Sequence, residues 1–156
     1  MKNILRSLTL AVLIGGLAGT VLAKGPVVHG GNFGIGLVIG EPGDWGITGK
    51  IWMARSSALQ LGLNVDDGTV LQGDYLWHYY DLVHPSRGEW PLYVGVGGAV
   101  ALEGEGAFAV RGPLGMDYLF DSVPVDLFVE VVPLIWFFDG GNDFRVDAGI
   151  GARYFF

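Results

Sequence analysis

Two ionisable residues near the middle of the chain, Asp74 and His78, are the first candidates for catalysis. They are four residues apart. In a strand this spacing puts both side chains on one face, but about 13 Å apart, which is too far for direct contact. The spacing therefore favours a hydrogen-bonded interior histidine over a catalytic pair.

Acidic residues at predicted turns are the second candidate site. Carboxylate oxygens are the ligands that Ca²⁺ and Mg²⁺ prefer, so four residues are metal candidates: Asp66, Asp67, Asp139 and Asp143. The alternative is that these residues are solvated turn tips, because Asp and Gly suit tight turns. The pattern leaves both interpretations open, and no other cofactor is expected.

The elements that carry these residues are predicted to be strands, because apolar and polar residues alternate in eight segments. Gly, Asp, Ser and Pro clusters separate the segments, and no helical pattern lies between them. Short hairpins joining eight strands predict an all-β, eight-stranded antiparallel up-and-down β-barrel. The expected strands are Asn32–Gly40, Gly46–Met53, Ala58–Val65, Thr69–Leu82, Leu92–Leu102, Ala107–Phe120, Pro124–Phe138 and Asp143–Phe156.

Composition excludes several classes of protein. The chain has 156 residues, of which 51% are hydrophobic and 16% charged, and it has no Cys. Intrinsic disorder, a disulfide scaffold and a Cys-based zinc site are therefore excluded. The formal charge of −7 argues against a nucleic-acid partner, which requires clustered Lys and Arg.

The N-terminus has the pattern of a secretory signal peptide. Lys2 and Arg6 precede a short apolar run, and small residues stand before the expected cleavage site after Ala23. An N-terminal membrane anchor is the alternative, but the apolar run is short for a spanning helix. We expect residues 1–23 to be the signal and residues 24–156 the barrel, with a charge of −9 once Lys2 and Arg6 are gone.

Each predicted strand has an apolar face and a face of Gly, amide and charged residues. A soluble lipocalin-like barrel would turn the apolar face inward, and a membrane barrel would turn it outward. Few charges on the strands and aromatic residues near the strand ends, typical of an aromatic girdle, favour the membrane barrel. The interior polar cluster is then expected to contain Lys50, Asp74, His78, Arg111, Asp117, Asp126, Glu130, Arg145, Asp147 and Arg153.

The C-terminal strand carries a family resemblance. Alternate apolar residues end on a C-terminal aromatic side chain: Ile150, Ala152, Tyr154 and Phe156. This ending resembles the terminal strand of small bacterial outer-membrane β-barrel proteins of OmpA/OmpX-type architecture, and the chain is similar to functionally uncharacterised exported barrels. The resemblance implies location in the cell outer membrane of a Gram-negative envelope, recognition of these four residues by the barrel-assembly machinery, and contact with membrane lipid and lipopolysaccharide. It also implies a monomer.

The expected topology concentrates negative charge at one end. With both termini periplasmic, the outer loops hold eight acidic residues and no basic ones: Glu41, Asp44, Asp66, Asp67, Glu103, Glu105, Asp139 and Asp143. Ca²⁺ or Mg²⁺ held there would also bridge lipopolysaccharide phosphates. The interior is nearly neutral and just wide enough for side chains, so we expect a cross-linked plug.

A specific ion pair is predicted inside this plug. If the last hairpin turns at residues 139–142, Arg153 lies opposite Phe128 and diagonal to both Asp126 and Glu130. A guanidinium there would reach both carboxylates.

An enzymatic alternative is carried by one short motif. His84-Pro85-Ser86 resembles the His-x-Ser element of outer-membrane lipid A deacylases, with Glu89 as a third member. The motif falls in a Pro-containing connection that is expected to be periplasmic, rather than on a lipid-facing strand. We therefore expect no catalytic residues, and a barrel with a structural or surface-interaction role. Lipid A modification and soluble periplasmic binding are the alternatives.

Overall fold

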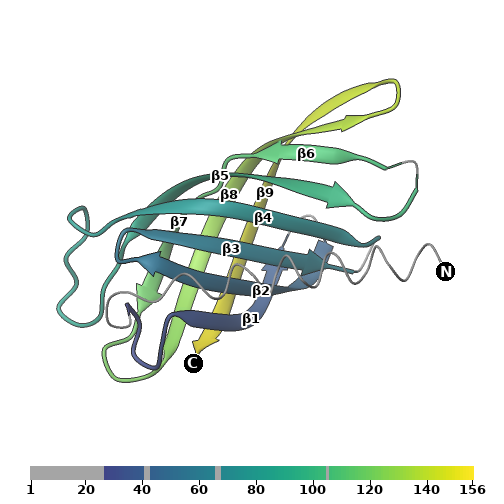
Figure 1. The fold of residues 1–156 in the computed structure, drawn as a ribbon. Helices are drawn as coiled ribbons and strands as arrows, with labels where there is room; N and C mark the ends of the chain where they lie inside the picture. Colours follow the sequence, from purple (N-terminus) through teal and green to yellow (C-terminus); the bar gives the residue numbers. More distant parts are fainter. Residues whose placement is uncertain (1–26, 41–42, 66–67, 105) are drawn as a thin grey trace.

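The structure is a computed structural model that describes residues 27–40, 43–65, 68–104 and 106–156. The described chain folds into one antiparallel sheet of nine strands (Figure 1). The strands are β1 (Phe33–Gly40), β2 (Gly43–Ala54), β3 (Ser57–Asn64), β4 (Val70–Tyr79), β5 (Leu92–Ala101), β6 (Phe108–Arg111), β7 (Leu114–Leu119), β8 (Val125–Phe138) and β9 (Gly141–Phe155). None of the described residues forms a helix long and apolar enough to cross a membrane.

Hydrogen bonds between neighbouring strands close the sheet into a ring. β1 to β5 pair in chain order, β8 pairs with β9, and β9 pairs with β1. The short strands β6 and β7 lie end to end between β5 and β8, and each pairs with both. The all-β, antiparallel prediction is confirmed.

The expected strand count of eight needs correction, because the sixth predicted segment is interrupted. Residues 112–113 belong to neither β6 nor β7. Pro113 has no N–H to donate to a ladder, and its carbonyl accepts a hydrogen bond from the Gly95 amide at 2.7 Å. The two short strands, β6 and β7, therefore correspond to one expected strand, and the other seven expected segments each match one strand.

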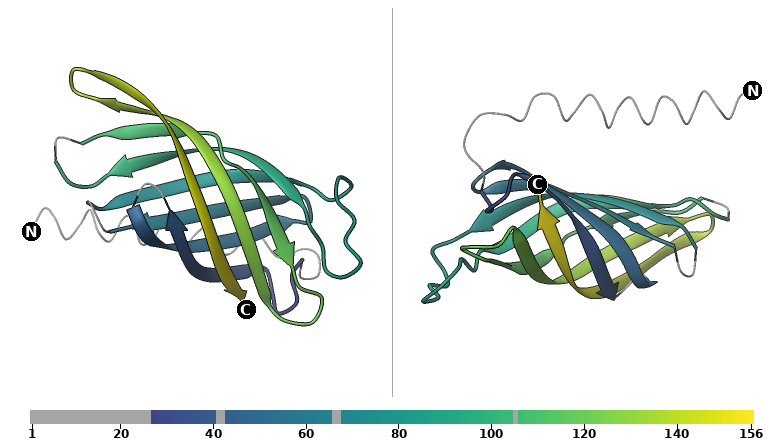
Figure 2. Two further views of the ribbon diagram at one scale, coloured as in Figure 1. Left: turned by 180° about the vertical axis from the view of Figure 1, so that it is seen from behind. Right: turned by 90° about the horizontal axis from the view of Figure 1, so that it is seen from below.

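Two ends of the ring differ in their connections. We call hairpin end the end of the ring at which β1 ends and β2 begins, β3 ends and β4 begins, β5 ends and β6 begins, and β8 turns into β9. The terminal end is the opposite one, which contains residues 55–56, 80–91 and 120–124 together with Phe156. β8 and β9 continue past their neighbours at the hairpin end (Figures 1 and 2). The β1–β9 ladder runs only as far as Gly40 and Gly149, so residues 141–148 extend beyond it.

Side chains alternate across the sheet, with polar groups pointing into the ring and large apolar groups pointing out. On β9 the exposed side chains include Ile150, Ala152 and Tyr154, while Arg153 between them is buried. On β1, Ile35, Leu37 and Ile39 are exposed. This orientation follows the period of two in every long strand.

Two apolar clusters lie inside the ring, one at each end. Trp52, Ala58, Leu119 and Phe155 pack together with Val28 at the terminal end. Ala99, Ala109, Leu134 and Trp136 form the cluster near the hairpin end. Some aromatic side chains near the strand ends, where the sequence predicted an outward aromatic girdle, thus point inward, since Phe155 and Trp136 are buried. Between the two clusters lie the buried polar side chains.

Candidate functional site

Asp117 on β7 is the centre of the buried polar network. Its Oδ2 accepts a hydrogen bond from Lys50 Nζ and lies 3.0 Å from His78 Nε2. Arg153 Nη1 is 3.7 Å from Asp117 Oδ1, and all four side chains are fully buried. One carboxylate therefore joins basic side chains of β2, β4 and β9 across the interior.

Arg153 on β9 makes contacts in several directions. Its Nη1 donates to Asp126 Oδ2 at 3.1 Å, its Nη2 donates to Gln60 Oε1, and its Nε lies 3.3 Å from Thr48 Oγ1. The guanidinium carbon stands 3.7 Å from the centroid of the Phe128 ring. The side chain thereby links β2, β3 and β8, and Arg–carboxylate and cation–π contacts fix its position.

The sequence predicted the Arg153–Asp126 contact, but in a different register. Asp126 is directly opposite Arg153, because the β8–β9 turn consists of Asp139 and Gly140 alone, with Phe138 paired to Gly141. A positive φ of 101° at Gly140 suits so tight a turn. The ladder is therefore shifted by two residues from the expected one, and the predicted contact between Arg153 and Glu130 is not among the ion pairs of the described residues.

Glu130 is held by neutral side chains. Gln60 Nε2 and Tyr93 Oη each donate to Glu130 Oε2 at 3.0 Å. Because Gln60 also accepts from Arg153, it connects Glu130 to the group around Asp117. The network thus extends toward the hairpin end through the Gln60 amide rather than through another ion pair.

A separate buried ion pair lies nearer the hairpin end. Arg111 Nε on β6 is 3.0 Å from Asp74 Oδ1 on β4, and Arg111 Nη1 donates to Gln72 Oε1. All three side chains are buried. A methyl group at Gly97 would collide with the Asp74 carboxylate, so this glycine leaves the space that the pair occupies.

Aromatic rings surround the basic groups at the other end of the network. The His78 ring centroid is 4.3 Å from that of Trp52 and 5.3 Å from that of Tyr93. Lys50 Nζ lies 4.5 Å from the Trp52 ring centroid. Rings of this kind stabilise a buried cation and exclude water. The His78 side chain is therefore enclosed, and Asp74, its sequence neighbour at four residues, binds Arg111 instead.

Nine of the ten predicted interior residues are buried, and Arg145 is the exception. Asp147 is buried on β9. The Arg145 side chain is 59% exposed, and its Nε contacts Asp143 Oδ2 at 2.7 Å. The physical reason is that β1 no longer pairs with β9 beyond Gly149, so at Arg145 the strand has a neighbour among the described strands on one side only and the side chain reaches solvent.

Neutral polar residues of the network were missed by sequence reasoning. They are Thr48, Gln60, Gln72 and Tyr93, and all are buried. They stand at alternate positions of their strands, on the same face as predicted interior residues such as Lys50 and Asp74, and this placement could have identified them. Tyr93 stands near a strand end, where the sequence predicted an aromatic girdle, yet its ring points inward.

The motif of the enzymatic alternative is not assembled into a catalytic group. His84 and Ser86 are exposed in the β4–β5 connection, and among the described residues no hydrogen bond joins them. Glu89 Oε1 accepts a hydrogen bond from Arg55 Nη2 at 2.5 Å, which raises the pKa of the Arg55 guanidinium above its ordinary value. The guanidinium carbon of Arg55 also lies 4.5 Å from the Tyr80 ring, and burial raises the pKa of the Tyr80 hydroxyl well above its ordinary value.

Two of the four metal candidates, Asp139 and Asp143, are among the described residues. Asp66 and Asp67 lie outside the described residues, as do Glu41 and Glu105. Asp139 is exposed and Asp143 contacts Arg145. Within the described ranges no group of three or more His, Asp or Glu side chains is arranged to hold a metal ion. A Ca²⁺ or Mg²⁺ site at this end stays a prediction.

In comparison with known proteins, no protein-family model, curated protein or solved structure matched this chain. The functional argument therefore depends on the geometry of the chain itself. The interior of the ring offers ion pairs and hydrogen bonds that cross-link the strands, with an apolar cluster at each end. Such an arrangement can stabilise the closed ring of strands and fill its interior with side chains.

Proposed function

We propose that this protein is a transmembrane β-barrel of the bacterial outer membrane, with a plugged interior and a structural or surface-interaction role. The observation that supports this best is the orientation of the side chains. Charged groups such as Lys50, Asp117 and Arg153 are fully buried inside the ring. Large apolar side chains are exposed on the outside along every long strand.

Membrane lipid is the surrounding that best suits this outer surface. Exposed apolar patches on soluble monomers are rarely larger than a few hundred Å². On β1 of this protein, every second side chain is apolar and points outward: Phe33, Ile35, Leu37 and Ile39 are 46–64% exposed. Closure of the sheet by the β9–β1 and β4–β5 ladders also pairs the strand edges along most of the ring, as a membrane-spanning sheet requires. A soluble lipocalin-like barrel would need the opposite orientation.

The interior supports a plug rather than a channel. Arg153 contacts both Asp126 and Gln60, and Gln60 and Tyr93 each donate to Glu130 in the same network. An eight-stranded barrel is just wide enough to be filled by side chains. The nine strands of this ring occupy eight positions around it, because β6 and β7 share one.

Cell fractionation and gel migration test the proposal. The full chain is expressed in a Gram-negative bacterium, membranes are separated, and samples are run with and without heating. We expect the protein in the outer-membrane fraction and a faster-migrating folded form that heating converts to the slower one. Recovery in the soluble periplasmic fraction without detergent would contradict the proposal.

A further inference from the structure

The hairpin end of the ring has a step between β9 and β1. Along the other described ladders of this end, the largest offset between neighbouring strands is three residues, at β2, where β3 ends opposite Gly46. β9 begins at Gly141, whereas its ladder with β1 ends at the Gly40–Gly149 pair. Residues 141–148 therefore have β8 on one side and no described strand on the other, along about 27 Å of strand (Figure 1).

Backbone groups of this segment are directed toward the open side. Near the other end of β9, Phe156 N–H donates to Phe33 O on the β1 side, whereas Phe155 N–H donates to Pro124 O on the β8 side. Successive residues of a strand point their backbone groups to opposite sides, and the β8–β9 ladder keeps one register throughout. The N–H and C=O groups of three residues therefore lie on the open side: Asn142, Phe144 and Val146. Such an edge is a template for another strand.

Side chains of the segment carry a pattern that its own reverse can match. Phe144 and Val146 are 63% and 55% exposed on the outward face. On the inward face, Arg145 Nε lies 2.7 Å from Asp143 Oδ2. A second copy running in the opposite direction presents an arginine where the first has an aspartate, because these two charges lie two residues apart on one face.

We propose that two copies of the chain pair through this edge, antiparallel, with Phe144 of one copy opposite Phe144 of the other. The two-fold axis is perpendicular to the sheet, so outward side chains stay on one face. Asp143 of each copy lies opposite Arg145 of the other, and the three open residues form about six hydrogen bonds, two for each pair. A shift of two residues in either direction would place Asp143 opposite Asp143, or Arg145 opposite Arg145, which is destabilising.

The length of the step also fits a second copy. In this register the turn at Gly140 of one copy lies opposite Ala148 of the other, directly beyond the last pair of the β1–β9 ladder. Each β8–β9 hairpin thereby fills the step of the other copy. A free peptide would satisfy the same backbone groups, but it would leave the step of the rim unfilled.

The paired rings point in opposite directions. Resting on the proposed function, the contact joins barrels of two facing membranes, and each barrel stays a monomer within its own membrane. Two copies in one membrane would have to pair their β9 strands in parallel. A two-fold axis along those strands would place the apolar outward face of one copy beside the polar inward face of the other.

Disulfide cross-linking in detergent tests the register, because the chain has no Cys. Cα atoms directly opposite each other in an antiparallel pair are about 4.5–5.5 Å apart, which a disulfide can bridge. We expect Phe144→Cys to form a linked dimer on mild oxidation. Asn142→Cys is the matched control, because it lies opposite Val146 and about 13 Å along the strand from Asn142 of the other copy. Equal cross-linking of both variants would overturn the register.

Sedimentation in detergent measures the strength of the pair. Phe144→Pro removes an N–H on the open side and no hydrogen bond to β8, whereas Phe144→Ala keeps that N–H. We expect about tenfold weaker dimerisation of the proline variant than of the alanine variant, the effect of two lost backbone hydrogen bonds. Arg145→Asp should weaken the dimer, and Asp143→Arg in that background should restore it. Equal dimerisation of the proline and alanine variants, or no recovery on charge exchange, would refute the pairing.

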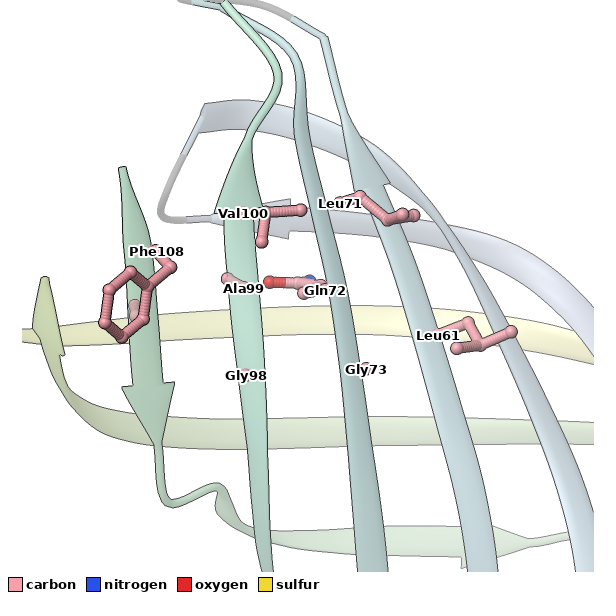
Figure 3. Close-up of a pocket in the computed structure, with 9 residues that line it drawn as sticks. Leu61, Leu71, Gln72, Gly73, Gly98, Ala99, Val100 and Phe108 are labelled. Carbon is pink, nitrogen blue, oxygen red and sulfur yellow. The ribbon is translucent and has the colours of Figure 1, made fainter. Parts of the chain in front are cut away.

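A hollow on the outward face is the other surface that could hold a second copy. Gly73 of β4 and Gly98 of β5 are ladder partners at its floor, and Leu61 and Phe108 stand beside them (Figure 3). Gly73→Leu fills this hollow, and its Cβ would meet Leu61 at 3.4 Å, an ordinary contact, so the variant should fold. We expect its dimer to be as strong as that of the wild type. A dimer lost in this variant would assign the contact to the hollow instead.

Vesicles of phospholipid alone test the facing arrangement, because they lack the sugars of lipopolysaccharide that would hold two surfaces apart. We expect vesicles with the wild-type protein to cluster and vesicles with Phe144→Pro to stay dispersed. Dispersed vesicles that hold inserted wild-type protein would refute the end-to-end pairing alone. Failure of the wild type to insert would instead refute the proposed function.

Discussion

Replacing Arg153 by Met should be the most damaging single change to the interior network. The guanidinium contacts Asp126 at 3.1 Å and Asp117 at 3.7 Å, and it also binds Gln60. Met keeps an apolar stem of similar length against Phe128 but removes the positive charge. Asp117 retains Lys50 and His78, whereas Asp126 loses the cation that contacts it. Breaking a buried pair in this way costs about 3–5 kcal/mol in the free energy of unfolding.

Urea unfolding of the protein folded into lipid vesicles, followed by tryptophan fluorescence, measures this cost. Arg55→Met is the control, because Arg55 forms a direct ion pair with Glu89, at 2.5 Å, but is 62% exposed. Exposed pairs contribute about 0–1 kcal/mol, so this variant should unfold almost as the wild type does. The difference between the two variants isolates the effect of burial.

A double variant identifies the cause of the loss. Replacing Asp126 by Leu in the Arg153→Met background removes the unpaired carboxylate, and should recover part of the lost free energy of unfolding. Asp117 remains neutralised by Lys50 in that background. A cost below about 1 kcal/mol for Arg153→Met, or no recovery in the double variant, would refute the reasoning.

Three further predictions concern a glycine of the strands, the C-terminal residue and the interior of the ring. Gly97→Ala should lower the free energy of unfolding by about 1–3 kcal/mol, because the new methyl group collides with Asp74, while Gly49→Ala has room and should leave urea unfolding unchanged. Phe156→Ala should reduce folded protein in cells severalfold yet refold in detergent with wild-type yield, since the resemblance gives this residue a role in assembly; equal losses in both assays would contradict that role. The wild-type protein should give no conductance steps in planar bilayers if the interior is plugged as proposed, and stable single-channel currents would contradict the plug.

Alternation was enough to predict the strands, and together with the few charges on the strands and the aromatic residues near their ends it predicted most of the buried polar residues. Lys50, Asp117 and Asp126 stand at inward positions because the period of two assigns every second residue to one face. The same rule misplaced Arg145, since alternation does not say where the ring ends along β9. Knowing the extent of the β1 ladder, which stops at Gly149, would have been necessary.

The register of the strands and the partners of the buried side chains were harder to predict than the face of the sheet on which each side chain lies. The Arg153–Asp126 contact depends on a two-residue turn at Asp139 and Gly140, and a turn longer by two residues was expected from the same sequence. Gln60 and Tyr93 were not assigned to the network, because neutral side chains at inward positions resemble fillers until their partners are known. Pro113 was the one visible signal for the interruption between β6 and β7.

Accessibility of single spin labels on the outward face tests the central claim most directly. The chain has no Cys, so single Cys variants at Ile39, Val129 and Ile150 can each be labelled after folding into vesicles. These three side chains are exposed and neighbour one another across β1, β9 and β8. If the outward face contacts lipid, the labels should collide often with oxygen and rarely with a water-soluble nickel complex. Frequent collisions with the nickel complex at all three positions would contradict the account.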